Sequence, residues 1–85
     1  PIDYYRKLAF NYYLSQRFEL TQRETGIVEL LVSGKSIPEI ASELSISQST
    51  VKTHLHNVYG KANVRSQGEL LSLIDSEHHA FFNGG

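Results

Sequence analysis

The stretch from Ser47 to Val64 constrains the fold most, because its sequence, SQSTVKTHLHNVYGKANV, encodes a helix with one apolar side. Apolar residues recur there at spacings of four, three and four, which places them in a single stripe along a helix. The stripe consists of Val51, Leu55, Val58 and Ala62. This pattern predicts that the stripe packs on the protein interior and that the opposite side of the helix faces solvent.

The opposite side of this helix is polar and carries no acid. Its residues are Ser49, Thr53, His56 and Gly60, flanked by Lys52 and Asn57. No Asp or Glu occurs between Glu43 and Glu69, whereas Lys61 and Arg65 fall within that window. The whole chain has a net charge of −1 and a pI near 6.5, far from the basic balance typical of DNA-binding domains. The positive charge is therefore local, and a helix with such a side can enter a DNA groove.

The size and composition of the chain predict one small all-α domain. Its 85 residues suffice for a single core of three or four helices. The chain has no cysteine, which excludes disulfides and thiolate metal sites. No apolar run approaches the roughly 20 residues that span a bilayer, and no signal peptide is visible, so we expect a cytoplasmic domain. The first residue is Pro1 and Met is absent, which favours a segment of a longer protein with an upstream sensory or regulatory domain, either cytoplasmic or membrane-attached.

Three capping boxes divide the rest of the chain into helices. A capping box is a Ser or Thr followed three residues later by Glu, and it marks a helix start. The pairs are Thr21 with Glu24, Ser36 with Glu39, and Ser66 with Glu69. The first of these helices carries an apolar face of Ile27, Leu30 and Leu31, with Val28 at its edge, and Gly34 ends it. The last is expected to run to about Ser76.

The connection before the Ser47 to Ala62 helix is short. Ser45, Ile46 and Ser47 form a three-residue turn in which Ser47 caps the helix. Ile46 can pack on Val51 as a hydrophobic staple, which fixes the angle between the two helices. Asn63 tolerates the left-handed conformation that ends a helix. These signals predict a helix-turn-helix unit.

The two ends of the chain are less regular. Residues 1–19 hold most of the aromatic residues and are either a linker or an extra amino-terminal helix. Residues 77–85 are treated as a carboxyl-terminal tail, frayed or docked. In the last helix, Leu70, Leu71, Leu73 and Ile74 span about 160° of the circumference, more than one packing face needs. We therefore consider Leu71 and Ile74 as dimer contacts, with simple core packing as the alternative.

Several segments together resemble a known family. LTQRE, IPEIASELSIS, TVKTHLHNVYGKANV and SQGELL are similar, in order and spacing, to the LuxR-type (GerE-type) helix-turn-helix domain of bacterial transcription regulators. The resemblance covers about Leu20 to Ile74 and implies a four-helix domain over residues 20–76. It further implies that the third of these helices enters the major groove and that the fourth mediates dimerisation on a two-fold operator.

The resemblance also assigns roles to residues. It implies that three side chains lie near base edges, namely Lys52, Thr53 and His56. It implies phosphate contacts by Ser49, Thr50, Lys61 and Arg65. Gln67 stands where the family usually has arginine, and Gly60 stands where a long or basic residue is more common, so both changes reduce the expected DNA affinity.

Other functions find less support in the sequence. A protein-interaction module that keeps the fold with weak DNA affinity is the main alternative, favoured by the slight acidic balance and the aromatic first segment. The chain has no nucleophile elbow, no phosphate-binding loop and no paired catalytic carboxylates, so we expect neither an enzyme nor a cofactor. His54 and His56 lie about 200° apart on a helix and cannot share a metal ion.

Overall fold

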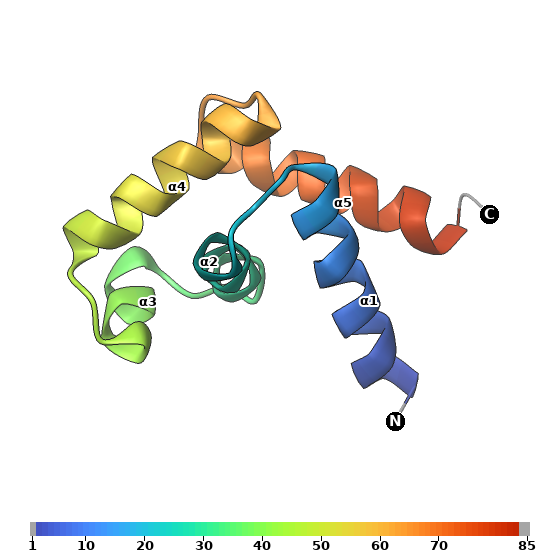
Figure 1. Cartoon of the computed structure of the whole chain (residues 1–85), viewed down its shortest axis with the longest axis horizontal. Coiled ribbons are helices and arrows are strands. Elements are labelled where there is room, and N and C mark those ends of the chain that lie inside the picture. Colours follow the sequence, from blue (N-terminus) through green and yellow to red (C-terminus); the bar gives the residue numbers. More distant parts are fainter. Residues whose placement is uncertain (1, 84–85) are drawn as a thin grey trace.

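Five helices and short connections make up residues 2–83, the part of the chain that this computed structural model describes. The helices are α1 (Ile2–Arg17), α2 (Gln22–Val32), α3 (Ile37–Leu44), α4 (Gln48–Ala62) and α5 (Gln67–Asn83). Helix α2 lies at the centre, with α3 and α4 on one side and α1 and α5 on the other (Figure 1). The four predicted helices are therefore α2 to α5, and the predicted all-α fold is confirmed. None of the helices described is long and apolar enough to cross a membrane.

The capping signals act as predicted at α2 and α3. The Thr21 hydroxyl accepts from the Glu24 amide at 3.1 Å, and the Glu24 carboxylate accepts from the Thr21 amide at 2.9 Å. Ser36 and Glu39 form the same reciprocal pair. At α5 only half of the box forms: Ser66 accepts from the Glu69 amide, while the Glu69 carboxylate accepts from the amide of Arg65, one residue earlier than expected.

Left-handed residues follow four of the helices, including Glu19 with φ 55° after α1. Gly34 has φ 98° after α2, and Asn63 has φ 57° after α4, so both predicted stop signals are confirmed. Ser45 ends α3 with φ 57°, a conformation that costs a residue with a Cβ about 1–2 kcal/mol. The turn is stabilised by the Ile46 amide, which donates to the Ala41 carbonyl at 3.0 Å. This tight turn sets α4 at an angle to α3 and completes the helix-turn-helix unit.

The apolar stripe of α4 packs on the core as predicted. Val51, Leu55, Val58 and Ala62 are all buried. They join buried residues of every other helix in one cluster, which includes Ile27 and Leu31 of α2 and Ile40 of α3. Because this side of α4 is fixed in the interior, the opposite side faces solvent.

The first segment is a helix that belongs to the domain, which decides between the two readings left open for residues 1–19. Phe10 and Leu14 of α1 are buried and belong to the common core. Together with Val28 of α2 they line one groove, and this contact explains why Val28, expected at the edge of its helix, is 3% exposed.

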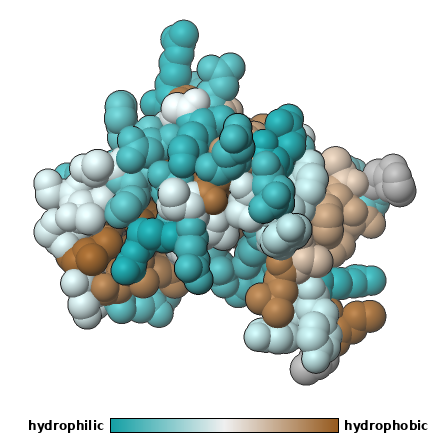
Figure 2. Space-filling view, in the orientation of Figure 1, coloured by the Kyte–Doolittle hydropathy of each residue, from teal (hydrophilic) through white to brown (hydrophobic). Residues whose placement is uncertain are grey.

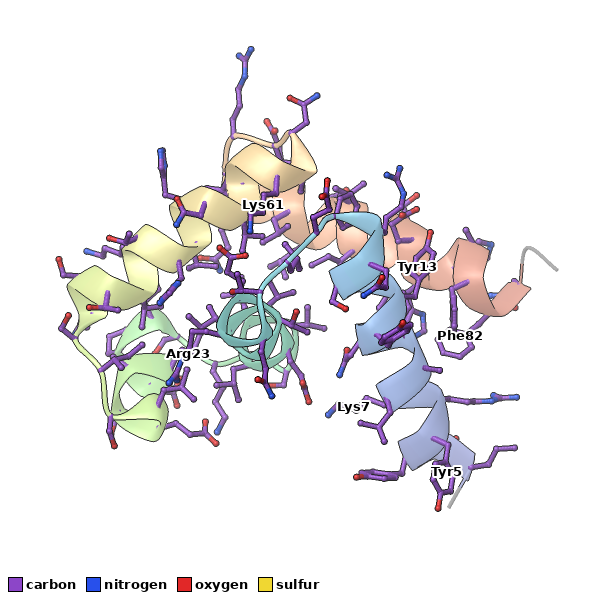
Figure 3. All side chains as sticks on the ribbon, in the orientation of Figure 1. Tyr5, Lys7, Tyr13, Arg23, Lys61 and Phe82 are labelled. Atoms are coloured by element: carbon purple, nitrogen blue, oxygen red, sulfur yellow. The ribbon has the colours of Figure 1, made fainter. Side chains whose placement is uncertain are left out.

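The predicted end of the last helix is wrong. We expected α5 to stop near Ser76 and residues 77–85 to form a tail, but the helix continues to Asn83. The reason is contact with α1: Tyr13 donates to the Glu77 carboxylate at 3.1 Å, and the Phe10 ring lies 6.0 Å from that of Phe82, between centroids. Tyr13 of α1 and Phe82 of α5 are labelled in Figure 3, and the Tyr13 ring lies 5.1 Å from that of Phe81, the residue before Phe82, between centroids. Residues 84 and 85 of the expected tail lie outside the described part.

The structure also separates the two residues considered as dimer contacts. Ile74 is 5% exposed and lines the same groove as Phe10 and Leu14, so the core alternative holds for it. Leu71 is half-buried at the edge of the core. The wide apolar side of α5 is thus covered in part by α1 of the same chain, which the sequence pattern had not placed.

Two leucines of α1 test whether this helix is an integral part of the fold. Leu14 is 4% exposed, so Leu14→Ala should remove about 2–4 kcal/mol from the free energy of unfolding through lost burial and a cavity. Leu8 is 47% exposed, and Leu8→Ala serves as the matched control with a change of about 0.5 kcal/mol or less. Urea denaturation followed by circular dichroism measures both. Equal effects of the two changes would contradict the packing of α1 on the core.

Candidate nucleic-acid interface

The residues that the sequence predicted to contact DNA are all exposed, but not all of them lie on the outer side of α4. Seven predicted contact residues are exposed: Ser49, Thr50, Lys52, Thr53, His56, Lys61 and Arg65. The first five lie on α4 within its first three turns, whereas Lys61 is in its last turn and Arg65 follows it. Helix α4 carries no acidic residue. The surface over α4 is mostly hydrophilic or intermediate in Figure 2, while apolar surface gathers over α3 and α1.

Local hydrogen bonds between Ser47 and Thr50 cap the start of α4. The Ser47 hydroxyl accepts from the Thr50 amide at 3.0 Å, and the Ser47 and Thr50 hydroxyl oxygens lie 2.8 Å apart. The Thr50 hydroxyl is therefore partly committed to the cap, whereas Ser49 is exposed. The amides of a first helical turn lack intrahelical acceptors and carry the positive end of the helix dipole. This end of α4 can accept an anion such as a phosphate.

The middle of α4 combines an apolar and two polar contact groups. The Thr53 hydroxyl donates to the Ser49 carbonyl at 3.0 Å, so its hydrogen atom is used within the helix. Its methyl group remains for an apolar contact, of the kind that a thymine methyl offers. Lys52 and His56 are four residues apart and therefore neighbours on the helix surface. Together the three residues offer a cation, a methyl group and an imidazole within about one turn of the helix.

Lys61 has a partner that the sequence did not reveal. Its ammonium donates to the Glu24 carboxylate at 2.6 Å, and the two side chains are 34% and 5% exposed. Lys61 points from α4 toward α2 in Figure 3. The pair joins the last turn of α4 to the first turn of α2, so it fixes the position of α4 on the domain. The sequence had assigned Glu24 to capping alone, because nothing local links residues 37 positions apart.

Glu24 is held ionised by this environment. Burial raises its pKa, but the hydrogen bonds from the Lys61 ammonium and the Thr21 amide outweigh burial and bring the pKa below the ordinary 4.5. Glu24 is the one buried charged residue among residues 2–83. Lys61 balances its negative charge, and its carboxylate accepts hydrogen bonds from Lys61 and the Thr21 amide. Glu24 therefore does not add an acid to the outer side of α4.

Two further positions complete the surface. Arg65 is exposed in the turn after α4. Gly60 lies on the outer side of α4, and a Cβ built on it meets no atom within 4 Å. His56, Asn57, Gly60 and Lys61 line an open hollow of about 490 Å³ beside Glu24. Within residues 2–83, no three His, Cys, Asp or Glu side chains gather closely enough to hold a metal ion.

The Glu24–Lys61 pair predicts a dependence of stability on pH. Since the folded-state pKa of Glu24 lies below its ordinary value, the unfolded chain takes up the proton first as the pH falls. The pair therefore stabilises the protein above about pH 4.5, and this contribution is lost as the pH drops below that value.

Lys61→Met tests the pair while keeping the apolar stem of the side chain. It should lower the free energy of unfolding at neutral pH by about 1–2 kcal/mol, because it leaves a buried carboxylate without its main donor. It should also reduce the loss of stability on acidification. Urea denaturation at neutral and acidic pH measures both effects, with Lys35→Met as control at an exposed lysine. Equal behaviour of the two variants would show that the pair adds nothing.

The comparisons with known proteins agree with this architecture. Residues 19–74 match the family described as bacterial regulatory proteins, luxR family. The spore germination protein GerE of Bacillus subtilis is 46% identical over 50 residues, which are 59% of this chain and 68% of that protein. The transcriptional regulator MalT of Vibrio campbellii is 42% identical over 57 residues, and that of Vibrio cholerae is 44% identical over 56.

The MalT regulators are much longer than this chain. The matched part covers 67% of this chain but only 6% of the Vibrio campbellii protein. No solved structure matches the chain. The match begins at residue 19 and ends at residue 74, so it includes α2, α3, α4 and the first half of α5 but not α1. The family match covers the helix-turn-helix unit and the whole of α4 with its exposed outer side. The chain therefore belongs to the luxR family of bacterial regulatory proteins.

Proposed function

We propose that this chain is the sequence-specific DNA-binding part of a bacterial transcription regulator, and that α4 enters the major groove. The observation that carries the proposal is the outer side of α4, which is exposed over its full length and free of acids. An α-helix with polar side chains and a phosphate-binding start fits the width of the major groove. Helix α1 packs on the other side of α2 and leaves this surface free (Figure 1).

The contacts divide into two kinds. Lys52, Thr53 and His56 lie near base edges, where a cation, a methyl group and an imidazole can distinguish base pairs. Ser49, Thr50 and Arg65 hold phosphates, which position the helix but carry no sequence information. The Lys61 ammonium has three N–H donors. One of them donates to the Glu24 carboxylate, and another reaches a phosphate across the open hollow beside it.

The domain acts as a homodimer on two half-sites of a two-fold operator. Two-fold symmetric proteins match palindromic sites, with recognition helices about one helical turn of DNA apart. Of the residues first considered on α5, Leu71 remains as a candidate contact because Ile74 is buried. The full-length regulator works in the cytoplasm and carries an upstream sensory or regulatory domain, which is consistent with the greater length of the MalT regulators.

Salt dependence of DNA binding tests the phosphate contacts. Arg65→Ala should weaken binding to all DNA sequences alike and lower the slope of log K against log salt by about one unit. Lys52→Ala should instead weaken binding most for the preferred sequence, by about 1–3 kcal/mol, if its contact is to a base. Fluorescence anisotropy with a selected and a scrambled duplex measures both variants.

Lys7→Ala is the control for these measurements, since Lys7 lies on α1 beside Glu29 and away from α4. If no sequence preference emerges from selection on random oligonucleotides, and Arg65→Ala leaves the salt slope unchanged, the proposed function is wrong. A protein-interaction module would then be the better reading, with the exposed tyrosines of α1 as its surface.

Gly60 offers a test that increases affinity. The space around it is open, so Gly60→Lys fits without moving a neighbour and adds a cation to the surface that meets DNA. We expect tighter binding with a salt slope steeper by about one unit. Gly60→Gln has similar length without the charge and should leave the slope unchanged. Both variants should be slightly more stable than the parent chain, because glycine inside a helix costs up to about 1 kcal/mol.

A further inference from the structure

Three helices leave a groove between them on the side of α2 that is turned away from α4 (Figure 1). Its volume is about 540 Å³, within the roughly 300–1,000 Å³ typical of small-molecule sites. We call it the α1–α2–α5 groove. Its apolar lining includes Phe10 and Leu14 of α1, Val28 and Val32 of α2, and Ile74 and Phe82 of α5. None of the seven predicted DNA contact residues lines this groove, so the proposed function leaves it without a role.

The groove is apolar at its inner end and charged at its outer end. Leu14, Val28 and Ile74 line the inner end and are 4%, 3% and 5% exposed. Asp3 and Arg6, from the first turns of α1, line the outer end and are exposed. Asp3 and Leu14 are 11 positions apart on one helix, so the groove is roughly 16 Å long. This gradient suits a ligand with an apolar chain and a polar head.

Arg6 at the outer end is a cation without an acid partner. Within residues 2–83, no carboxylate oxygen lies within 4.0 Å of its guanidinium. The guanidinium carbon lies 5.9 Å from the centre of the Phe82 ring, so the ring supports one face of the plane at the edge of the groove. The N–H groups of the guanidinium can donate in parallel to both oxygens of a carboxylate. Arg6 therefore favours a ligand whose head is a carboxylate.

The other charges at the outer end do not reverse this preference. Lys7 lies 3.7 Å from Glu29, but the two side chains are 62% and 40% exposed, so the pair is weak and Lys7 can also turn toward a bound anion. Asp3 is in the first turn of α1, where the amides of the helix start offset part of its charge. His78 adds a ring nitrogen that can donate a hydrogen bond. With Arg6, these groups favour an anionic head over a cationic one.

We propose that the α1–α2–α5 groove binds a small molecule with a linear apolar chain and a terminal carboxylate, such as a free medium-chain fatty acid. The chain lies beside Phe10 toward the inner end, and the carboxylate accepts from Arg6 at the outer end. An extended chain advances about 1.2 Å per bond, so about ten carbon atoms fill most of the groove length. The bound molecule contacts all three helices and stabilises α1 in its position on α2 and α5. The inference does not rest on DNA binding, and its test contains no DNA.

Isothermal titration calorimetry of the 85-residue chain with decanoate tests the proposal, with every ligand below its micellar concentration. We expect saturation at one molecule per chain, a dissociation constant on the order of 100 μM and a higher midpoint of thermal unfolding. Octanoate lacks two methylene groups and should bind about tenfold more weakly. Decyltrimethylammonium has the same apolar chain with a cationic head, and it should bind about fivefold more weakly than decanoate because it meets Arg6 and Lys7.

Arg6→Gln tests the contact with the head group. The change removes the charge from an exposed side chain, so the circular dichroism spectrum should stay the same while decanoate binds about fivefold more weakly. Binding of decyltrimethylammonium should not weaken. Arg23→Gln is the matched control, since Arg23 is an exposed arginine of α2 that does not line the groove and lies toward α3 in Figure 3.

Val32→Glu tests the apolar wall of the groove. Val32 is 51% exposed, so the fold should tolerate an acid there. The new carboxylate should weaken decanoate binding about fivefold and should strengthen the binding of decyltrimethylammonium. Ser42→Glu adds the same charge at an exposed position of α3 and should leave the binding of both ligands unchanged.

Four results would overturn the inference. The first is the lack of saturable binding of decanoate at millimolar concentration. The second is binding of decyltrimethylammonium as tight as that of decanoate, which would show that the head group is not recognised. The third is an equal effect of Arg6→Gln and Arg23→Gln, which would place the carboxylate elsewhere. The fourth is binding to phosphatidylcholine vesicles that contain fatty acid without binding of free decanoate, which would indicate a lipid surface as the partner.

Discussion

The packing of the α4 stripe into the core is the constraint on which the rest of the structure depends. Val51 and Leu55 are buried against α2 and α3, so rotation of α4 about its axis would expose apolar surface. The same burial holds Lys52 and Thr53 in solvent, because they lie on the other side of the helix. The Glu24–Lys61 pair adds a fixed point at the far end of α4. A recognition surface needs this rigidity, since its side chains must reach defined positions along a duplex.

Helices α1 and α5 form a second, mutually dependent unit. The second half of α5 carries too few apolar residues to be stable alone, and its aromatic side chains find their partner in Phe10 of α1. In turn α1 buries only Phe10 and Leu14, whereas Tyr5 and Tyr12 on its opposite side are exposed. The family match excludes α1, so this helix is an addition that enlarges the core and offers a new surface.

The candidate site could be predicted from the sequence to a large extent, because a helix fixes the direction of its side chains by local periodicity. The exposure of Lys52, Thr53 and His56 follows from the burial of the stripe alone. The partner of Lys61 could not be predicted, because Glu24 is distant in sequence and had a sufficient role as a cap. The burial of Ile74 was equally out of reach, since it depends on where α1 packs.

The sequence by itself determined local features of the fold, namely where several helices start and end. Capping boxes, left-handed residues and apolar spacing act within a few residues, and they defined the starts of α2, α3 and α4 and the ends of α2 and α4. Only the tertiary structure decided that α1 joins the core, that α5 continues to Asn83, and that Lys61 holds Glu24. These outcomes depend on contacts between segments far apart in the chain, whose free energy exists only once the other helices are in place.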